Sequence, residues 1–292
     1  MTSAKVIKDT CSGKTRLITV EVEFHRFILP EVNTHRCLSR NYQSSRAIPV
    51  EKTIEQVRNN PAMPVHWGKN QRGMQAELLL DNVSAECVED MWLTSAENAA
   101  NSAEYMKDKG CHKQVVNRIL EPFVWTKGVV TATQEGWDSF FALRIHKDAQ
   151  PEIKLLAEKI KEAVGASFCQ VLLEGEWHLP YVDNLSEFES IQDAIKVSAS
   201  SCAQVSYRVL DTSLEKARRI YDMLNLPEKG VYKEDPAHFS PCEHVAMATS
   251  EYHSAEELGL IYSPSDISGN FQTMDYFQYR KALQFGDEGL LV

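Results

Sequence analysis

The feature that most constrains the fold is a strict alternation of apolar and polar side chains near the start of the chain. In the stretch RLITVEVEF, residues 16–24, apolar side chains occupy every second position from Ile18 to Phe24. Threonine and glutamate fill the positions between them. Because successive side chains of a strand point to opposite faces of a sheet, this pattern predicts a half-buried β-strand.

Helical patterns and one further strand-like stretch fill much of the chain that follows. Residues 83–109 place Val83 and Met91 near helical spacing, which predicts a long amphipathic helix. The stretch VWTKGVVTATQ is β-branched and strand-like, and PEIKLLAEKIKEAVGASF predicts a second long helix. No low-complexity linker separates these patterns, so we expect one α/β (α+β) domain over residues 1–292. Residues 251–292 are expected to form its C-terminal extension.

The composition narrows the class of protein. The chain has 292 residues and a formal net charge of −10. This charge argues against a broad nucleic-acid-binding face, because phosphate binding needs clustered lysine and arginine. No apolar run approaches the roughly 20 residues that a membrane span requires, and the N-terminus lacks the apolar core of a signal peptide. We therefore expect a cytoplasmic protein that binds neither nucleic acid nor a membrane.

The cysteines show no pattern of a disulfide framework or a zinc site. Their number is odd, they are scattered, and no C-x-x-C pair occurs. The seven are Cys11, Cys37, Cys87, Cys111, Cys169, Cys202 and Cys242. We expect reduced thiols that pack as small apolar side chains.

A basic and hydroxyl-rich run, NTHRCLSRNYQSSRAIP, spans residues 33–49 of this acidic chain. Its arginines can bind phosphate through charge-assisted, bidentate contacts, and its hydroxyls add directional hydrogen bonds. The run therefore indicates a small anion-binding pocket. A solvated loop with incidental arginines fits the bare pattern equally.

The same run resembles the signature of the flavin-dependent thymidylate synthases, the ThyX family, which is written RHRxxSxNExSxR. The matching residues are His35, Arg36, Ser39, Asn41, Ser44 and Arg46. The chain departs from the signature at Thr34 and Tyr42, where the family has Arg and Glu. It also carries Glu31 where many members have an upstream Gln.

Residues 112–165 are similar to a second block of the family, with the order and spacing kept. The match places Arg118 and Arg144 on two family arginines, and AQPEI on the family's AQxEI core. Three departures fall on flavin-contact positions of the family: Thr133, Glu135 and Ser139.

A third block, over residues 200–250, resembles the family's N-terminal block but lies after the other two. Its family positions are Ser206, His238, Ser240, Glu243 and His244. This order suggests a circularly permuted or rearranged member, a change that a fold tolerates when its termini lie close together. The resemblance implies a ThyX-like fold, with a mixed or antiparallel sheet flanked by long helices.

The resemblance also implies a chemistry: transfer of a methyl group to C5 of dUMP, with FAD, NADPH and methylenetetrahydrofolate, in a homotetramer without a protein nucleophile. Arg144 would activate the pyrimidine, and Ser44, Arg46 and Arg118 would hold the nucleotide phosphate and sugar. Glu31 and Tyr42 would lie on the nucleotide side. The flavin side would comprise His35, Arg36, Ser39, Asn41, Thr133, Ser139, His238 and Ser240.

The departures leave two other functions open. A carboxylate at Glu31 can accept a hydrogen bond from the exocyclic amine of cytosine, which uracil lacks, so flavin-dependent hydroxymethylation of dCMP (or dUMP) is an alternative. Thr34 and Glu135 remove cations that family members direct at the flavin. A nucleotide-binding protein without catalytic activity is therefore a further alternative.

Overall fold

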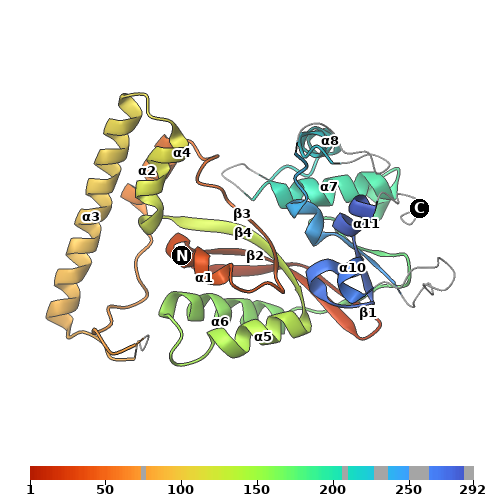
Figure 1. Ribbon diagram of the computed structural model, residues 1–292, viewed down its shortest axis with the longest axis horizontal. Coiled ribbons are helices and arrows are strands. Elements are labelled where there is room, and N and C mark those ends of the chain that lie inside the picture. Colours follow the sequence, from red (N-terminus) through yellow and green to blue (C-terminus); the bar gives the residue numbers. More distant parts are fainter. Residues whose placement is uncertain (74–76, 206–209, 227–235, 250–262, 286–292) are drawn as a thin grey trace.

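The alternating stretch near the N-terminus forms strand β2 (Thr15–His25), the central strand of a five-stranded sheet of order β3-β4-β2-β1-β5 (Figure 1). The computed structural model describes residues 1–73, 77–205, 210–226, 236–249 and 263–285. The other strands of this sheet are β1 (Ser3–Ser12), β3 (Ser39–Tyr42), β4 (Trp125–Thr133) and β5 (Gln170–Val171). Only β5, which pairs with β1, runs parallel to its neighbour in this sheet. The predicted α/β class with a mixed, largely antiparallel sheet is confirmed.

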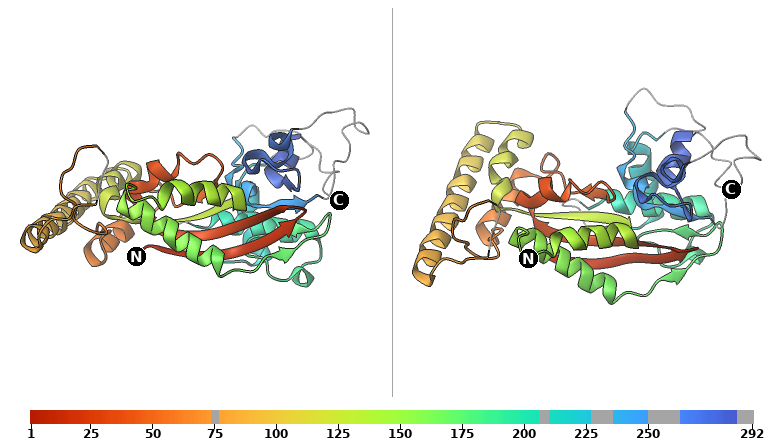
Figure 2. Two further views of the ribbon diagram at one scale, coloured as in Figure 1. Left: turned by 90° about the horizontal axis from the view of Figure 1, so that it is seen from below. Right: turned by 60° about the horizontal axis from the view of Figure 1, so that its bottom comes forward.

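Two helices cover the apolar face of β2, namely α5 (Gln134–Arg144) and α6 (Pro151–Gly165) (Figure 2). Ile18 and Val20 are fully buried in one apolar cluster with residues of both helices. Within it, Trp137 donates a hydrogen bond from Nε1 to the carbonyl oxygen of Ile18 at 3.3 Å. The helix α6 confirms the second long helix that the sequence predicts.

The polar face of β2 is also covered, which differs from the predicted half-buried strand. Thr19 is fully buried, and its hydroxyl lies 2.8 Å from Nε2 of His178. Glu21 accepts a hydrogen bond of 2.8 Å from the Tyr181 hydroxyl. These partners lie about 160 residues further along the chain, so the local pattern could not reveal them.

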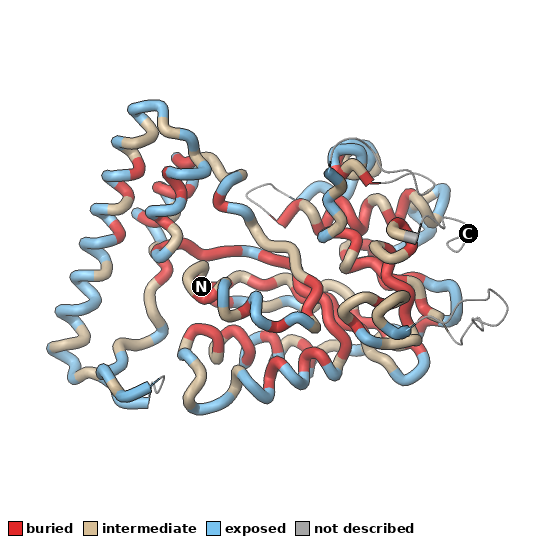
Figure 3. The backbone as a smooth tube through the Cα atoms, in the orientation of Figure 1, coloured by how far each residue is buried: buried red, intermediate tan, exposed pale blue. Residues whose placement is uncertain are grey.

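A second layer stands beside the sheet and consists of α2 (Val50–Asn59), α3 (Asn82–Asp108) and α4 (Lys113–Val116) (Figure 1). The predicted long helix is confirmed as α3, but its buried face is not the predicted one. It packs through Ala96, Ala100 and Ala103, whereas Val83 and Met91 are 71% and 63% exposed. Figure 3 shows most of α3 as exposed. Small side chains at helical spacing allow α2 to approach closely.

The second half of the chain builds a smaller sheet of order β6-β7-β8. Its strands are β6 (Trp177–His178), β7 (Ala246–Ala248) and β8 (Tyr276–Gln278). The helices around it are α7 (Ile191–Ala203), α8 (Leu214–Met223), α10 (Pro264–Ser268) and α11 (Tyr279–Phe285). Residues 263–285, part of the expected extension, share a buried cluster with α7, in which Ala282 is fully buried.

Short helical turns connect these elements. The four-residue α1 (Leu29–Val32) lies between β2 and β3, and 3₁₀ helices span Arg26–Ile28, Asn117–Phe123, Leu185–Glu187, Ser240–His244 and Gly269–Phe271. Among the described residues, no helix is long and apolar enough to cross a membrane.

The expectation of reduced thiols is wrong for one pair of cysteines. Cys11 and Cys169 form a disulfide across a sequence separation of 158 residues. Parallel pairing of β1 with β5 brings them together, which no local pattern shows. The free cysteines in the described part of the chain are Cys37, Cys87, Cys111, Cys202 and Cys242.

Candidate active site

The basic run at residues 33–49 lies along the edge of the main sheet. Its middle part forms β3, which pairs with β4 from Ser39 opposite Thr131 to Tyr42 opposite Gly128. Because a strand advances about 3.3 Å per residue, the two ends of the run reach different surroundings. The start lies beside α5, and the end lies beside the 3₁₀ helix Asn117–Phe123.

The start of the run holds the side chain of Arg144. Arg144 donates from Nε to Nε2 of His35 at 2.8 Å, and from Nη2 to the hydroxyl of Thr34 at 3.2 Å. A longer bond of 3.4 Å reaches the carbonyl oxygen of Glu31. The guanidinium, at the last turn of α5, is therefore fixed in direction while its surface remains partly exposed.

His35 is neutral in this arrangement. Its side chain is buried and packs edge-on against Phe140, with 4.8 Å between the ring centroids. Burial, and then the nearby cations of Arg144 and Arg40, together lower the pKa of His35 to about 4. A neutral ring can accept the hydrogen bond from Arg144 without charge repulsion.

The end of the run forms a second group with Arg118. Asn117 anchors the loop by donating to the carbonyl oxygens of Ser45 and Ile48 at 2.7 and 2.9 Å. Ser44 and Arg46 are exposed on this loop. Arg118, also exposed, forms an ion pair of 2.9 Å with Glu121. The structure thus places Ser44, Arg46 and Arg118, the three predicted phosphate ligands, on adjacent segments. Arg144 lies at the other end of the run.

The middle of the run borders a cavity of about 580 Å³. Arg36 and Arg40 lie on one side of it, and Ser240 and Glu243 of the third block lie on another. Apart from Leu38 of the run, the remaining lining residues come from residues 265–284, including Arg280 and Lys281. The four cations outnumber the one carboxylate, so the donor set suits an anionic ligand such as a dinucleotide cofactor.

With this geometry in view, comparison with known proteins identifies the family. The family model described as Thymidylate synthase complementing protein (Thy1) matches residues 15–168, more than half of the chain. The chain belongs to this family. The match includes the motif run and the second block, and the third block lies beyond it.

The individual relatives of this Thy1 family member match it over a short segment or at low sequence identity. The flavin-dependent thymidylate synthase of Aquifex aeolicus (strain VF5) is 39% identical over 62 residues, which cover 21% of this chain and 20% of the relative. The chain thus matches about a fifth of the length of that curated relative.

Similar solved structures include crystal structures of a UMP/dUMP methylase, PolB, from Streptomyces cacaoi. The complex with 5-Br UMP has a TM-score of 0.47 and 13% identity, covering 56% of this chain and 89% of that chain. The complex with 5-Br dUMP has a TM-score of 0.43 and 17% identity, covering 51% and 67%.

Several residues that the Thy1 resemblance assigns to the flavin already have partners within the protein. The buried hydroxyl of Ser39 donates to Asn270 at 2.9 Å, and Asn41 donates to the carbonyl oxygen of Cys202 at 2.7 Å. Thr133 caps α5 by accepting from the backbone N–H of Gly136 at 3.2 Å. These three side chains thus join elements of the fold.

Ser139 and His238, also assigned to the flavin, are exposed and are not among the residues that line the cavity. Ser206 of the third block lies outside the described residues. The third block nevertheless reaches the motif run, because Asn41 bonds to its Cys202 and Ser240 lines the same cavity as Arg36.

Tyr42 and Glu31, which the resemblance assigns to the nucleotide side, occupy different places. Tyr42 packs its ring edge-on against Phe24, 5.6 Å between centroids, and its buried hydroxyl has no partner among the described residues. Burial raises the pKa of Tyr42. Glu31 lies on α1, next to Arg144, and its Oε2 is buried without a partner in the described structure.

Sequence reasoning did not identify Asn270, Gln278, Arg280 and Lys281 as site residues. The segment NFQTMDYFQYRK does resemble RFILPEVNTHRC, since each is an apolar and aromatic run that ends at basic residues. The basic end YRK was therefore the one available signal, and it was too weak to carry a prediction.

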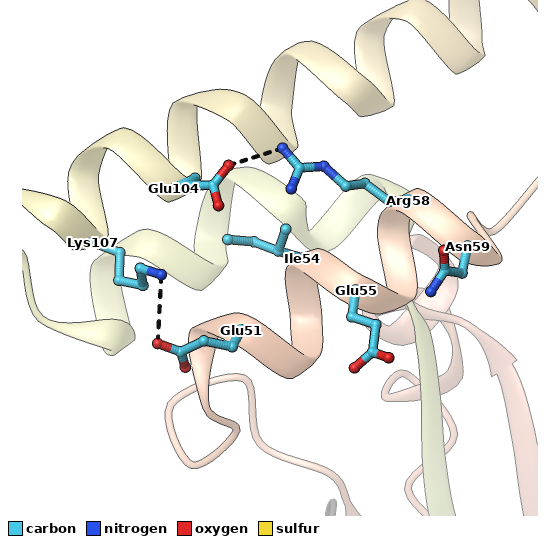
Figure 4. Close-up of a pocket in the computed structure, with 7 residues that line it drawn as sticks. All are labelled: Glu51, Ile54, Glu55, Arg58, Asn59, Glu104 and Lys107. Carbon is cyan, nitrogen blue, oxygen red and sulfur yellow. Dashed lines mark hydrogen bonds and ion pairs between the residues drawn. The ribbon is translucent and has the colours of Figure 1, made fainter.

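A second pocket lies between α2 and α3 and is a poor candidate for anion binding. Figure 4 shows its lining residues, with Arg58 pointing to Glu104 and Lys107 pointing to Glu51. The ion pairs measure 3.0 and 3.7 Å. Both cations are already paired with carboxylates, and these ion pairs join the two helices.

Proposed function

We propose that the protein is a flavin-dependent one-carbon transferase acting at C5 of a pyrimidine deoxynucleoside monophosphate. The reaction is the conversion of dUMP to dTMP, with FAD as cofactor and methylenetetrahydrofolate and NADPH as co-substrates. The observation that carries the proposal is the Arg144 guanidinium, held by the neutral ring of His35 within the family motif. Family membership supports the reaction class, and the resemblance to the homotetrameric ThyX enzymes supports a homo-oligomer.

Arg144 is assigned to the pyrimidine. A fixed cation beside the uracil ring favours loss of the N3 proton, because it stabilises the resulting anion. The ionised ring is richer in electrons at C5, the atom that receives the carbon. Thr34 and His35 hold the guanidinium in one orientation, so little reorganisation is needed when the charge develops.

The remaining residues bind the two phosphate-bearing ligands. Ser44, Arg46 and Arg118 are assigned to the nucleotide phosphate, and Arg36 and Ser240 to the flavin in the cavity of about 580 Å³. A flavin bound there would supply the hydride that completes the methyl group. Of the predicted flavin ligands, Arg36 and Ser240 line this cationic cavity, which supports the assignment.

Hydroxymethylation of dCMP is a second candidate, which one observation favours. Glu31 lies beside Arg144, and its buried Oε2 lacks a partner among the described residues. A carboxylate oxygen in that position can accept from the exocyclic amine of cytosine. The cation of Arg144 favours the uracil anion, which places dUMP first.

The test is a product assay on the purified protein. The protein with FAD, NADPH and methylenetetrahydrofolate is incubated with dUMP in one arm and dCMP in the other, and products are identified by mass spectrometry. We expect dTMP from dUMP and no change in dCMP. A hydroxymethyl product from dCMP with dUMP untouched would select the second candidate, and no product in either arm would refute both.

A further inference from the structure

The cavity beside the motif run is built mainly by the C-terminal segment. Of its thirteen lining residues, eight lie between Ser265 and Gln284. This segment lies beyond residues 15–168, which the family model matches, and beyond the third block at 200–250. It therefore adds a wall to the site that the family motifs do not assign.

Two cations from different segments of the chain line this cavity and are free to bind a ligand. Arg36 of the motif run and Lys281 of α11 form no hydrogen bond or ion pair with any described residue, and both line the cavity. Arg40 uses Nη1 to hold the carbonyl oxygen of His35 at 2.6 Å. Arg280 is paired with Glu243 and lies over the ring of Phe239. The cavity thus carries four cations against one carboxylate, within a chain whose net charge is −10.

The buried amide of Gln278 connects the C-terminal segment of the cavity with the third block and with the motif run. Gln278, 1% exposed, donates from Nε2 to the carbonyl oxygen of Glu243 at 3.0 Å and to Asn270 at 3.3 Å. Asn270 also accepts from Ser39 at 2.9 Å. With its oxygen occupied by these donors, the amide nitrogen of Asn270 remains as a donor at the cavity wall.

The turn that carries Asn270 depends on a glycine. Gly269 has φ of +59°, and a Cβ atom there would lie 2.5 Å from Oε1 of Gln278. The close approach and the left-handed backbone both require glycine at this position. The donors at this wall are therefore held in place before any ligand binds, which lowers the entropy cost of binding.

The size and charge of the cavity fit a dinucleotide better than a single phosphate. Small-molecule sites commonly enclose about 300–1,000 Å³, and this cavity measures about 580 Å³. Several separate cations suit two linked phosphates, since each can meet a different oxygen. We infer that the C-terminal segment is part of the flavin site and that Lys281, together with Arg36, binds the flavin diphosphate. This inference rests on the proposed flavin-dependent function.

The test is a binding titration on the full-length protein, followed by flavin fluorescence, which does not require turnover. Lys281→Met should raise the Kd for FAD about 10-fold, because a charge-assisted contact contributes about 1.5 kcal/mol or more. Arg36→Met should have a similar effect. Riboflavin, which has no phosphate, should bind the variants and the wild type equally. Lys161→Met, an exposed lysine on α6, is the matched control and should leave the Kd unchanged.

A nucleotide phosphate is the other ligand that these cations could recognise, so dUMP is titrated in parallel. If Lys281→Met weakens dUMP and leaves FAD within twofold, or if the wild type fails to bind FAD, the inference is overturned. Thermal unfolding of each variant shows whether it is folded. If FAD binding depends on Lys281 but neither pyrimidine nucleotide is turned over, the inference stands and the proposed function fails.

Discussion

At the residue scale, Arg144 is the position on which the proposed chemistry depends. Arg144→Ala should lower kcat/KM for dUMP about 10²–10³-fold, the usual effect of removing one fixed electrostatic donor. Arg144→Lys should recover little, because an ammonium cannot contact His35 and Thr34 while facing a substrate. Initial rates of dTMP formation measure the effect.

The control for Arg144 is Arg58→Ala, which removes a guanidinium from the surface ion pair with Glu104 on α3. We expect its turnover to match the wild type. Activity of Arg144→Ala within twofold of wild type would show that this arginine does not contact the reacting base.

Two substitutions of Tyr42 test separately the packing of its ring and the hydrogen bonding of its hydroxyl. Its hydroxyl is buried without a partner in the described structure, so Tyr42→Phe should keep or raise the free energy of unfolding, by up to about 1 kcal/mol. Tyr42→Ala removes a ring that packs against Phe24 and should cost about 3 kcal/mol. Urea unfolding measures both. A loss of more than about 1 kcal/mol in Tyr42→Phe would reveal a bonded hydroxyl.

At the scale of elements, the disulfide holds an edge strand that has few other contacts. The strand β5 pairs with β1 at only two positions, and Val171 is 72% exposed. A crosslink that closes so long a loop restricts the unfolded chain, so Cys169→Ser should lower the free energy of unfolding by about 3–5 kcal/mol. Urea unfolding of oxidised protein measures the loss.

Cys87→Ser is the matched control for the disulfide, since Cys87 is a free, exposed cysteine on α3. It should unfold at the same urea concentration as the wild type. Equal stability of Cys169→Ser and Cys87→Ser would mean that the crosslink contributes nothing to the folded state.

The sequence predicted the long elements well because each carries its own periodicity. The strand β2 and the helices α3 and α6 were identified from spacing alone. The short strands β5, β6 and β7 have two or three residues each, so only tertiary partners define them. The buried face of α3 was missed because alanine gives a weak apolar signal beside exposed Val83 and Met91.

The residues of the candidate site also fall into those that the sequence identified and those that it did not. Order and spacing within the motif blocks identified His35 and Arg144, and the structure places their side chains 2.8 Å apart. Lys281 and Arg280 lie more than 200 residues beyond the motif run. Their relation to Arg36 follows from packing of the C-terminal segment, for which the sequence contained no comparable pattern.

At the scale of the whole molecule, a buried chain of hydrogen bonds crosses from one sheet to the other. It runs through Tyr276, Thr10, His178, Thr19, Thr131 and His244, with five contacts of 2.7–2.9 Å. All six side chains are fully buried. Since an unpaired polar group in such a place is costly, the chain fixes how the β6-β7-β8 sheet meets the main sheet.

This buried chain should make the protein sensitive to mild acid. Burial lowers the pKa of His244 to about 3 and holds the pKa of His178 well below its ordinary value. In the unfolded chain both rings take up protons near pH 6.5. The unfolded state therefore binds more protons between pH 6.5 and about 3, and stability falls as the pH is lowered through that range. At pH 5 each histidine should cost up to about 2 kcal/mol.

Urea unfolding at pH 7.5 and pH 5 measures this loss, above the range in which most carboxylates titrate. His244→Gln removes one of the two groups, so it should lose about 2 kcal/mol less than the wild type between the two pH values. His146→Gln, which replaces an exposed histidine after α5, is the control. An equal loss in wild type and His244→Gln would show that His244 is not kept neutral by burial. If the wild type is equally stable at both pH values, neither His178 nor His244 is kept neutral by burial.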